Sequence, residues 1–344
     1  MILGKVGVAA GKFFPPHRGH LASIINAATQ VEKLYVVVGD NPEYVRRKCE
    51  EVGLPEMPLR LRAKWLSQEL QGFDHIHVVM LDESGIPEYP EGWPLWSERL
   101  IKLIPEHIDV MFGGEPEYEE YNKIYLPTTK YVCYDPKRER YGVSGTAIRA
   151  NPLKYWDYIL GSARPFFAKK ILIAGSESCG KTTTTKYLAK IYHTSWSEEV
   201  GRYYSRDYLG GNEDVFTLDD FEKIAQLQYE QDMKALRTSN RVVFYDTDAV
   251  VTQFYCMKYL GASNEKIENW VDPSRYDAVL MFTPEVKWVD DGLRWMSDDK
   301  VRWDNHNKIK KMYEDRGFNN IIEISGSYNE RLGKCMEIVD TFLK

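Results

Sequence analysis

The chain has 344 residues, a length that suits two domains of ordinary size. Its 45 basic and 51 acidic residues give a formal net charge of −6, which argues against a broad basic surface for nucleic acid. Hydrophobic residues make up 43% of the chain, yet no apolar run reaches the ~18 residues of a membrane span, so we expect a folded cytoplasmic protein without nucleic-acid or membrane partners.

The cysteines and the N-terminus support this location. The five cysteines are scattered and form no C-x-x-C pair, which argues against a disulfide framework and a zinc site. Gly4, Lys5 and Gly7 interrupt the first apolar residues, so no signal peptide is expected.

In the first half, short apolar runs alternate with longer helical patterns, as in βαβ units with a parallel sheet. Strands are expected near residues 3–10, 33–39, 75–81, 109–112 and 130–134, and helices near 19–30, 59–71 and 95–104. Periodicity breaks over 158–170, just before a new apolar strand at 171–174. We therefore predict two α/β domains, 1–164 and 165–344, each with a parallel sheet flanked by helices.

A dense motif follows the first expected strand and leads into a helix. It consists of Gly11, Lys12, Phe13, Phe14, Pro15, Pro16, His17, Arg18, Gly19 and His20. Two imidazoles near a helix N-terminus suit a phosphate site, because adenylyl transfer needs donors aimed at the α- and β-phosphates of ATP rather than a protein nucleophile. A lone histidine more often packs or faces solvent, but the ten-residue pattern favours ATP binding by His17 and His20.

Residues 143–149 offer a second phosphate element. Ser144 and Thr146 carry small hydroxyl groups, and Arg149 follows at another expected helix start. Such donors suit the β- and γ-phosphates of ATP. Two phosphate elements far apart in the sequence support each other.

The second half again alternates strands and helices. A strand at 171–174 is followed by a glycine-rich loop and a helix at 182–193, and then by helical stretches at 218–236. A strand at 241–245, a helix, a strand at 278–282, and a last strand and helix after residue 320 complete the pattern. This alternation is typical of P-loop kinases.

The glycine-rich loop matches G-x-x-x-x-G-K-[ST] between a strand and a helix, which is the context that this motif requires. It consists of Gly175, Ser176, Glu177, Ser178, Cys179, Gly180, Lys181 and Thr182, followed by Thr183. Lys181 would reach the β- and γ-phosphates of ATP, and the Thr182 hydroxyl would ligate Mg²⁺. The alternatives are a chance Gly/Ser loop and, for Cys179, a reactive thiol instead of loop filler.

Asp246 and Asp248 follow an apolar strand, at the edge where ligands of parallel sheets bind. One could hold Mg²⁺ through water while the other orients the acceptor hydroxyl, and the sequence does not assign these roles. Asp248 fits a helix N-cap equally well.

Two other stretches also admit two interpretations. Residues 284–297 include Trp288 and Arg294 and are interpreted as a lid whose arginine closes over the transferring phosphoryl group. A solvated turn with an ordinary salt bridge is the alternative. Residues 198–204 fit either a polar acceptor site or the start of a charged helix.

The segments G-x-F-x-P-x-H-x-G-H at 11–20 and S-x-T-x-I-R at 144–149 are the motif pair of the nucleotidyltransferase superfamily. With a P-loop kinase pattern after them, the chain resembles the bifunctional NadR family, which joins a nicotinamide-nucleotide adenylyltransferase to a ribosylnicotinamide kinase. Family-like stretches occur along nearly the whole chain, at 89–93, 96–97, 151–159, 199–204, 246–248 and 288–294.

The resemblance implies a Rossmann-like nucleotidyltransferase domain at 1–164 and a P-loop kinase domain at 165–344, with ATP as co-substrate and Mg²⁺ as cofactor. Ribosylnicotinamide would be phosphorylated to nicotinamide mononucleotide, which would be adenylylated to NAD and pyrophosphate. These small molecules are the expected partners, and a homo-oligomer is left open. The implied substrate contacts are Glu199, Arg202, Tyr203, Asp246 and Trp288, with Trp93 and Trp96 beside the pyridine ring.

Some family members carry an N-terminal helix-turn-helix DNA-binding domain, whereas here the first catalytic strand begins near residue 3, so repression is not expected. Gly113 and Gly114 make their segment richer in glycine than the family pattern, with an effect left open. Two other functions compete. Residues 201–203 and 246–248 argue against coenzyme A synthesis, and the intact phosphate motifs argue against a non-catalytic ATP or NAD sensor.

Overall fold

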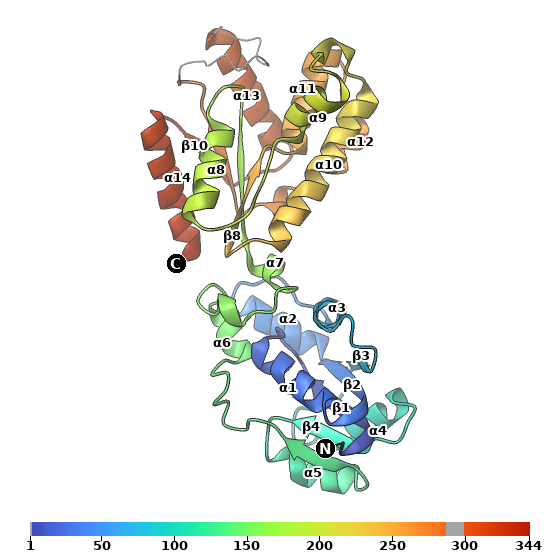
Figure 1. Ribbon diagram of the computed structural model, residues 1–344. Helices are drawn as coiled ribbons and strands as arrows, with labels where there is room; N and C mark the ends of the chain where they lie inside the picture. The colour runs from blue at the N-terminus through green and yellow to red at the C-terminus, as the bar shows by residue number, and fades with distance from the viewer. Residues whose placement is uncertain (1, 287–298) are drawn as a thin grey trace. The chain divides into compact units, whose positions relative to one another are not determined.

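The computed structural model describes residues 2–286 and 299–344 (Figure 1). Contacts divide the chain into two compact units, Met1–Arg164 and Pro165–Lys344. Each unit has its own five-stranded parallel sheet with helices on both faces, so the α/β fold class expected from the sequence is confirmed.

The first unit is built on a sheet with strand order β3-β2-β1-β4-β5. Its strands are β1 (Gly4–Gly11), β2 (Val31–Asp40), β3 (Ile76–Asp82), β4 (Val110–Gly113) and β5 (Lys130–Cys133). Its helices are α1 (Arg18–Ala28), α2 (Pro42–Glu50), α3 (Leu59–Glu69), α4 (Trp93–Leu103), α5 (Tyr118–Tyr125), α6 (Gly145–Ala150) and the short η1 (Trp156–Tyr158); α7 (Arg164–Phe167) follows at the junction of the units.

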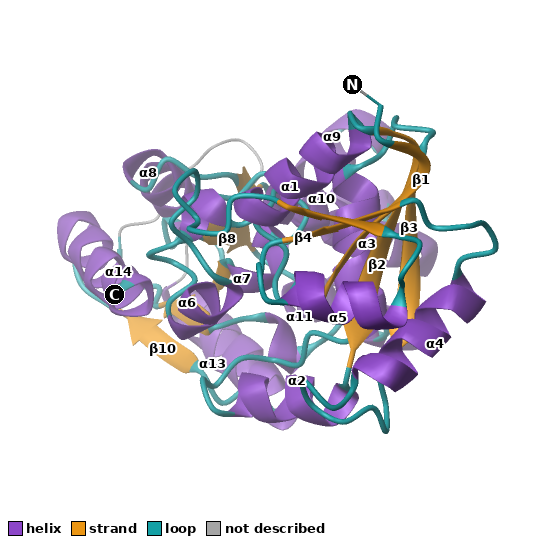
Figure 2. Cartoon of the chain, turned by 90° about the horizontal axis from the view of Figure 1, so that it is seen from below, coloured by secondary structure: helices purple, strands orange, loops and turns teal. Residues whose placement is uncertain are grey.

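Alternation along β2 shows how this sheet is buried on both faces. Leu34, Val36 and Val38 pack with α1 and α3, whereas Tyr35 and Val37 pack with α4 and the end of α5. Figure 2 shows α4 and α5 next to each other on one side of the strands. Successive side chains of a strand point to opposite faces, so an unbroken apolar run indicates cover on both sides.

The second unit has strand order β10-β9-β6-β8-β7. Its strands are β6 (Lys169–Gly175), β7 (Trp196–Ser197), β8 (Val242–Asp246), β9 (Ala278–Phe282) and β10 (Ile321–Ile324). Its helices are α8 (Lys181–Ile191), α9 (Val200–Tyr208), η2 (Glu213–Val215), α10 (Leu218–Arg237), α11 (Ala249–Leu260), α12 (Glu265–Glu268), η3 (Pro273–Arg275), α13 (Asp299–Asp315) and α14 (Tyr328–Leu343).

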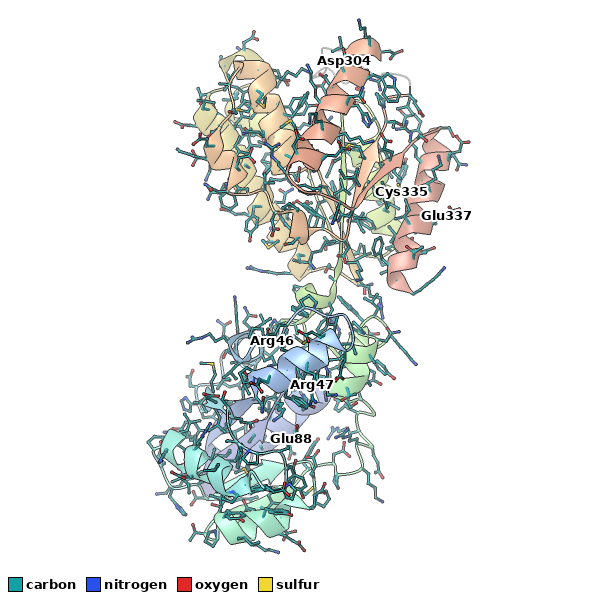
Figure 3. All side chains as sticks on the ribbon, turned by 180° about the vertical axis from the view of Figure 1, so that it is seen from behind. Arg46, Arg47, Glu88, Asp304, Cys335 and Glu337 are labelled. Carbon is teal, nitrogen blue, oxygen red and sulfur yellow. The ribbon has the colours of Figure 1, made fainter. Side chains whose placement is uncertain are left out.

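Helices α8 and α14 cover one face of this sheet, and α10 and α11 lie on the other side (Figure 1). Cys335 on α14 belongs to the buried core, while Glu337 on the same helix points outward (Figure 3). Capping boxes start helices α10 and α14, through Thr217 with Asp220 and Ser327 with Glu330.

Within 2–286 and 299–344, none of the helices combines the length and apolar character needed to cross a membrane. The strands and long helices expected from the sequence are present, with ends shifted by a few residues. Helices α2, α5, α9 and α13 and the two-residue strand β7 were not expected, although a charged helix start was one interpretation of 198–204.

Candidate nucleotide-binding sites

The switch point of the first sheet lies between β1 and β4, because the chain adds strands β2 and β3 on one side of β1 and β4 and β5 on the other. Ligands of open parallel sheets bind at the carboxyl ends of strands at such a point. The motif loop 11–20 leaves β1 at this edge and enters α1.

His17 and His20 lie face to face near the start of α1, with ring centroids 3.7 Å apart. The Nδ1 atoms of both rings are buried, and among the described residues neither has a hydrogen-bond partner. Burial, with the nearby charge of Arg138, lowers the pKa of His17 to about 4; burial and the neighbouring His17 hold the pKa of His20 well below its ordinary value. Both imidazoles are therefore neutral at pH 7, and each keeps one N–H donor.

Arg149 joins the two motifs, which are far apart in the sequence. Its Nη1 donates to Phe14 O at 2.5 Å and its Nη2 to Thr146 Oγ1 at 3.1 Å, and its guanidinium lies 4.2 Å from the centroid of the Phe14 ring. The backbones also approach closely, since a Cβ on Gly145 would lie 2.4 Å from Phe14 O. Ser144 caps α6 by accepting a hydrogen bond from Ala147 N at 3.1 Å.

A buried arginine that the sequence analysis missed supports the motif loop. Arg62 on α3 is 0% exposed. It donates from Nη1 to Lys12 O and to Gly39 O, the latter at 3.1 Å, and from Nη2 to the Asp40 carboxylate. It thereby ties the ends of β1 and β2 together. An arginine in an amphipathic helix gives no sequence signal of such a role, because most are solvated.

A cavity of about 410 Å³ opens at this edge of the sheet. Its lining includes Gly11, Lys12, Trp93 and Trp96, whereas Phe13 and Phe14 are buried in the fold. Lys12 Nζ donates to Glu83 Oε2 at 2.6 Å, and Trp96 Nε1 donates to Glu83 Oε1 at 3.2 Å.

The glycine pair after β4 has two different environments. Gly113 lines the cavity, and a Cβ there would lie 2.1 Å from Tyr131 Oη, so a larger residue at this position would displace the Tyr131 side chain. Gly114 has open space around it. At the cavity's edge, Glu88 lies 4.0 Å from Arg47 of α2 (Figure 3).

In the second unit, β6 leads through the loop Ser176–Gly180 into α8. Gly175 (φ +136°) and Gly180 (φ +82°) adopt conformations that favour glycine, and a Cβ on Gly175 would lie 2.5 Å from Phe282 O. Lys181 Nζ donates to Ser176 O at 2.8 Å. Cys179 is 1% exposed and its Sγ lies 3.3 Å from Glu177 O, which favours the loop-filler interpretation over an accessible thiol.

Asp246, at the end of β8, faces the start of α8. The Thr182 hydroxyl donates to Asp246 Oδ2 at 2.5 Å, and Oδ1 is buried without a partner among the described residues. Burial and the charge of Glu199 raise the pKa of Asp246 to about 7, against the opposing effects of Lys181, Thr182 and Arg202. Four charged side chains from three segments thus converge on one point.

Asp248, unlike Asp246, has hydrogen-bond partners that belong to helices α11 and α13. Its Oδ1 accepts hydrogen bonds from Val250 N at 3.1 Å, Val251 N at 3.3 Å and the Tyr313 hydroxyl at 2.5 Å. The N-cap alternative is therefore what the structure shows for Asp248. Burial raises its pKa to about 6.

A cavity of about 680 Å³ adjoins the P-loop. Loop residues 177–180 and Lys181, Thr182 and Thr183 line it, together with Glu199 and Arg202. Tyr203, an implied substrate contact, is not in this lining and packs against the apolar cluster around α10. It follows Arg202 by one residue and therefore points away from the helix face that carries residues 199, 202 and 205. Trp288 and Arg294 lie outside the described residues.

An aromatic wall of the same cavity was not predicted. It contains Phe216, Phe221, Tyr255 and Tyr259, and the Tyr259 hydroxyl donates to Glu213 Oε2 at 2.6 Å. These residues come from three separate segments, the end of η2, α10 and α11, and no sequence motif connects them.

Gln228 of α10 holds the start of α9. Its Oε1 accepts from Val200 N at 2.9 Å, and its Nε2 donates to Glu198 O at 3.2 Å and to the buried Asp232 at 2.9 Å. Asp232 in turn pairs with Arg275 at 2.8 Å. This network fixes the backbone on both sides of Glu199.

A family model described as an AAA domain matches residues 170–331. The chain is 34% identical to the trifunctional NAD biosynthesis/regulator protein NadR of Escherichia coli (strain K12), over 97% of this chain and 82% of that protein. It is 32% identical to the protein of the same description from Salmonella typhimurium (strain LT2), with the same coverage of both chains.

Two solved structures resemble the whole chain. A NadR protein in complex with NAD and AMP-PNP matches with a TM-score of 0.81 and 25% identity, over 100% of this chain and 98% of that chain. A NadR protein in complex with NR matches with a TM-score of 0.80 and 26% identity, over 99% and 97%.

Proposed function

Since the chain belongs to the NadR family and is an enzyme of NAD biosynthesis, we propose that it carries out two consecutive ATP-dependent steps, one in each unit. Residues 165–344 would phosphorylate ribosylnicotinamide, and residues 1–164 would adenylylate the resulting nicotinamide mononucleotide. The observation that carries the proposal is that each unit has its own sequence motif and its own cavity at the carboxyl edge of its own sheet. Residues 177–183 line the cavity of the second unit, and Gly11 and Lys12 are the motif residues that line the cavity of the first.

In the kinase step, the 5′-hydroxyl oxygen of ribosylnicotinamide attacks the γ-phosphorus of ATP, the bond to the β–γ bridging oxygen breaks, and ADP leaves. Lys181 and the P-loop N–H groups would bind the β- and γ-phosphates. Glu199 and Arg202, which line the cavity next to the P-loop, would contact the riboside. The aromatic residues of the lining support this assignment, because aromatic rings attract a cationic pyridinium ring.

Mg²⁺ fits the pair of Thr182 and Asp246. Among the described residues, no cluster of three or more His, Cys, Asp or Glu could hold a metal by itself. Mg²⁺ at P-loop sites takes most of its ligands from phosphates and water, and one hydroxyl and one carboxylate suffice from the protein. The buried Asp246 Oδ1, which has no hydrogen-bond partner within 2–286 and 299–344, fits this role. When bound, Mg²⁺ supplies positive charge that offsets the charge of the phosphates.

In the transferase step, a phosphate oxygen of nicotinamide mononucleotide attacks the α-phosphorus of ATP, and pyrophosphate leaves to give NAD. The neutral His17 and His20 would donate to the α- and β-phosphate oxygens. Ser144, Thr146 and Arg149 would bind the β- and γ-phosphates; a guanidinium has five N–H donors, so its bonds to Phe14 and Thr146 are compatible with this role. Trp93 and Trp96 would lie beside the pyridine ring.

Product analysis tests the proposal. Purified protein is incubated with MgATP and ribosylnicotinamide, and nicotinamide mononucleotide, NAD, ADP and pyrophosphate are separated by chromatography. We expect all four products. Mononucleotide and ADP alone would contradict the transferase assignment, turnover of phosphopantetheine instead would favour coenzyme A synthesis, and binding of ATP without turnover of any of these substrates would favour a sensor.

A further inference from the structure

Two buried arginines contact backbone carbonyls of the P-loop. Arg331 of α14 and Arg302 of α13 are 0% and 1% exposed. Arg331 Nη1 donates to Cys179 O at 3.1 Å, and Arg302 Nη2 donates to Ser178 O at 3.4 Å. Neither arginine belongs to the lining of the 680 Å³ cavity, which includes Ser178, Cys179 and Gly180 themselves. The arginines therefore contact the loop without lining the cavity.

Arg331 also connects the loop to the neighbouring ends of the sheet. Its Nε donates to Gly326 O at 2.6 Å, its Nη2 donates to Thr283 Oγ1 at 3.2 Å, and Glu285 Oε2 lies 3.7 Å from Nη2. Thr283 follows β9, and Gly326 lies between β10 and α14. Because all three guanidinium nitrogens have partners in a buried site, the plane of the side chain is fixed.

The direction of each carbonyl determines where the next N–H points. In a planar trans peptide the C=O and the following N–H point in opposite directions. When Arg331 binds Cys179 O, the N–H of Gly180 is turned away from Arg331, and Gly180 itself lines the cavity. The Arg302 bond to Ser178 O acts in the same way on the N–H of Cys179.

The loop backbone needs such support. Ser178 has φ +55°, in the left-handed region that residues other than glycine occupy only when their surroundings impose it. Arg302 binds the carbonyl of this residue, and Arg331 binds the next carbonyl along the chain. Both contacts fall on the strained part of the loop.

We propose that Arg331, assisted by Arg302, is a positioning residue of the P-loop, which presets the N–H groups of Gly180 and Cys179 for a nucleotide phosphate. The expected changes in KM rest on the proposed kinase function. The decisive test, an MgADP titration, rests only on nucleotide binding at the P-loop.

The test compares Arg331→Met, Arg331→Lys and Arg302→Met with the unsubstituted chain in a titration with MgADP. Binding at the P-loop is defined as the part of the MgADP titration signal that is lost in the Lys181→Ala variant. Arg316→Met is the matched control, because Arg316 directly follows α13, the helix that carries Arg302, but bonds to Glu268 and Met312 O instead of the loop.

We expect Arg331→Met to weaken MgADP binding by about 10- to 100-fold, the usual effect of losing a charged hydrogen-bond partner. The KM for ATP should rise by a similar factor, while the KM for ribosylnicotinamide stays within about twofold. Arg331→Lys should restore part of the affinity, because an ammonium group can donate to Cys179 O but cannot reach all the partners of a guanidinium in one plane. Arg302→Met should have a smaller effect, in keeping with its longer bond.

Unchanged MgADP affinity in Arg331→Met, with a melting temperature lowered as in Arg316→Met, would show a merely structural role and overturn the inference. If Arg331→Met does not fold, wild-type affinity in both Arg331→Lys and Arg302→Met would overturn it. Lys181-dependent MgADP binding without ribosylnicotinamide turnover would contradict the proposed function, and the titration would then decide the inference by itself. Absence of Lys181-dependent binding in the unsubstituted chain would overturn the inference as well.

Discussion

Asp246 is fully buried, yet it is the carboxylate on which the kinase proposal depends. Its pKa of about 7 lies above the ~3.9 of an unfolded aspartate, so between these pH values the folded state holds a proton that the unfolded state lacks. The free energy of unfolding therefore falls as pH rises through this window.

Asp246→Asn should remove that pH dependence. In the absence of nucleotide, we expect the free energy of unfolding of the variant, minus that of the unsubstituted chain, to be larger at pH 8 than at pH 5. Kinase turnover should be lost. Urea unfolding of the second unit at both pH values measures this. Asp304→Asn, which changes an exposed carboxylate on α13 (Figure 3), is the control. A stability difference that does not vary with pH would contradict the raised pKa.

Gly145 allows the two motifs of the first unit to meet, because there is no room for a Cβ against Phe14 O. We expect Gly145→Ala to lower the rate of NAD formation from nicotinamide mononucleotide by at least about 10-fold, since small displacements of groups that position a substrate reduce turnover strongly. Gly142→Ala is the matched control, because a Cβ there meets nothing within 4 Å. Equal activity of the two variants would count against a precise fit between the motifs.

At the scale of the element, Asp248 caps α11 and bonds to Tyr313 of α13. We expect Asp248→Ala to reduce the free energy of unfolding by about 2–4 kcal/mol, through the lost cap and the unsatisfied Tyr313 hydroxyl. Asp248→Asn should keep most of the stability and most of the kinase activity, because asparagine caps as well as aspartate. A stable Asp248→Asn variant without turnover would instead give this carboxylate a catalytic role. Urea unfolding and mononucleotide formation distinguish these outcomes.

Most strands and the long helices α10 and α14 were predictable because their apolar periodicity extends over many residues, as in β2 and α10. Helix α13 was not predicted, although it has 17 residues. Strand β7 has two residues and α2 buries only Val45 and Cys49, so neither gives a readable period. The glycine-rich and histidine motifs were visible for a different reason, since phosphate binding restricts residue types at fixed spacing. The aromatic wall and Arg62, Arg302 and Arg331 were not visible, because their roles depend on contacts between distant segments.

At the scale of the whole molecule, two compact units with separate sheets and cavities predict separable activities. Lys181→Ala should lower mononucleotide formation at least about 100-fold and leave NAD formation from supplied mononucleotide within about twofold. His20→Ala should do the reverse. Both rates are measured on the same preparations. Equal loss of both activities in either variant would show that the two sites do not work independently.

In both units, guanidinium groups bind carbonyls of the loop that carries the phosphate motif: Arg62 and Arg149 in the first, Arg302 and Arg331 in the second. Arginine stays protonated at every pH at which proteins fold. The shapes of the two loops should therefore tolerate acidification and alkalinisation alike. If nucleotide binding weakens in acid, the cause would then be the titrating groups that face the ligand. Their charge would change while the shape of the loops stays constant.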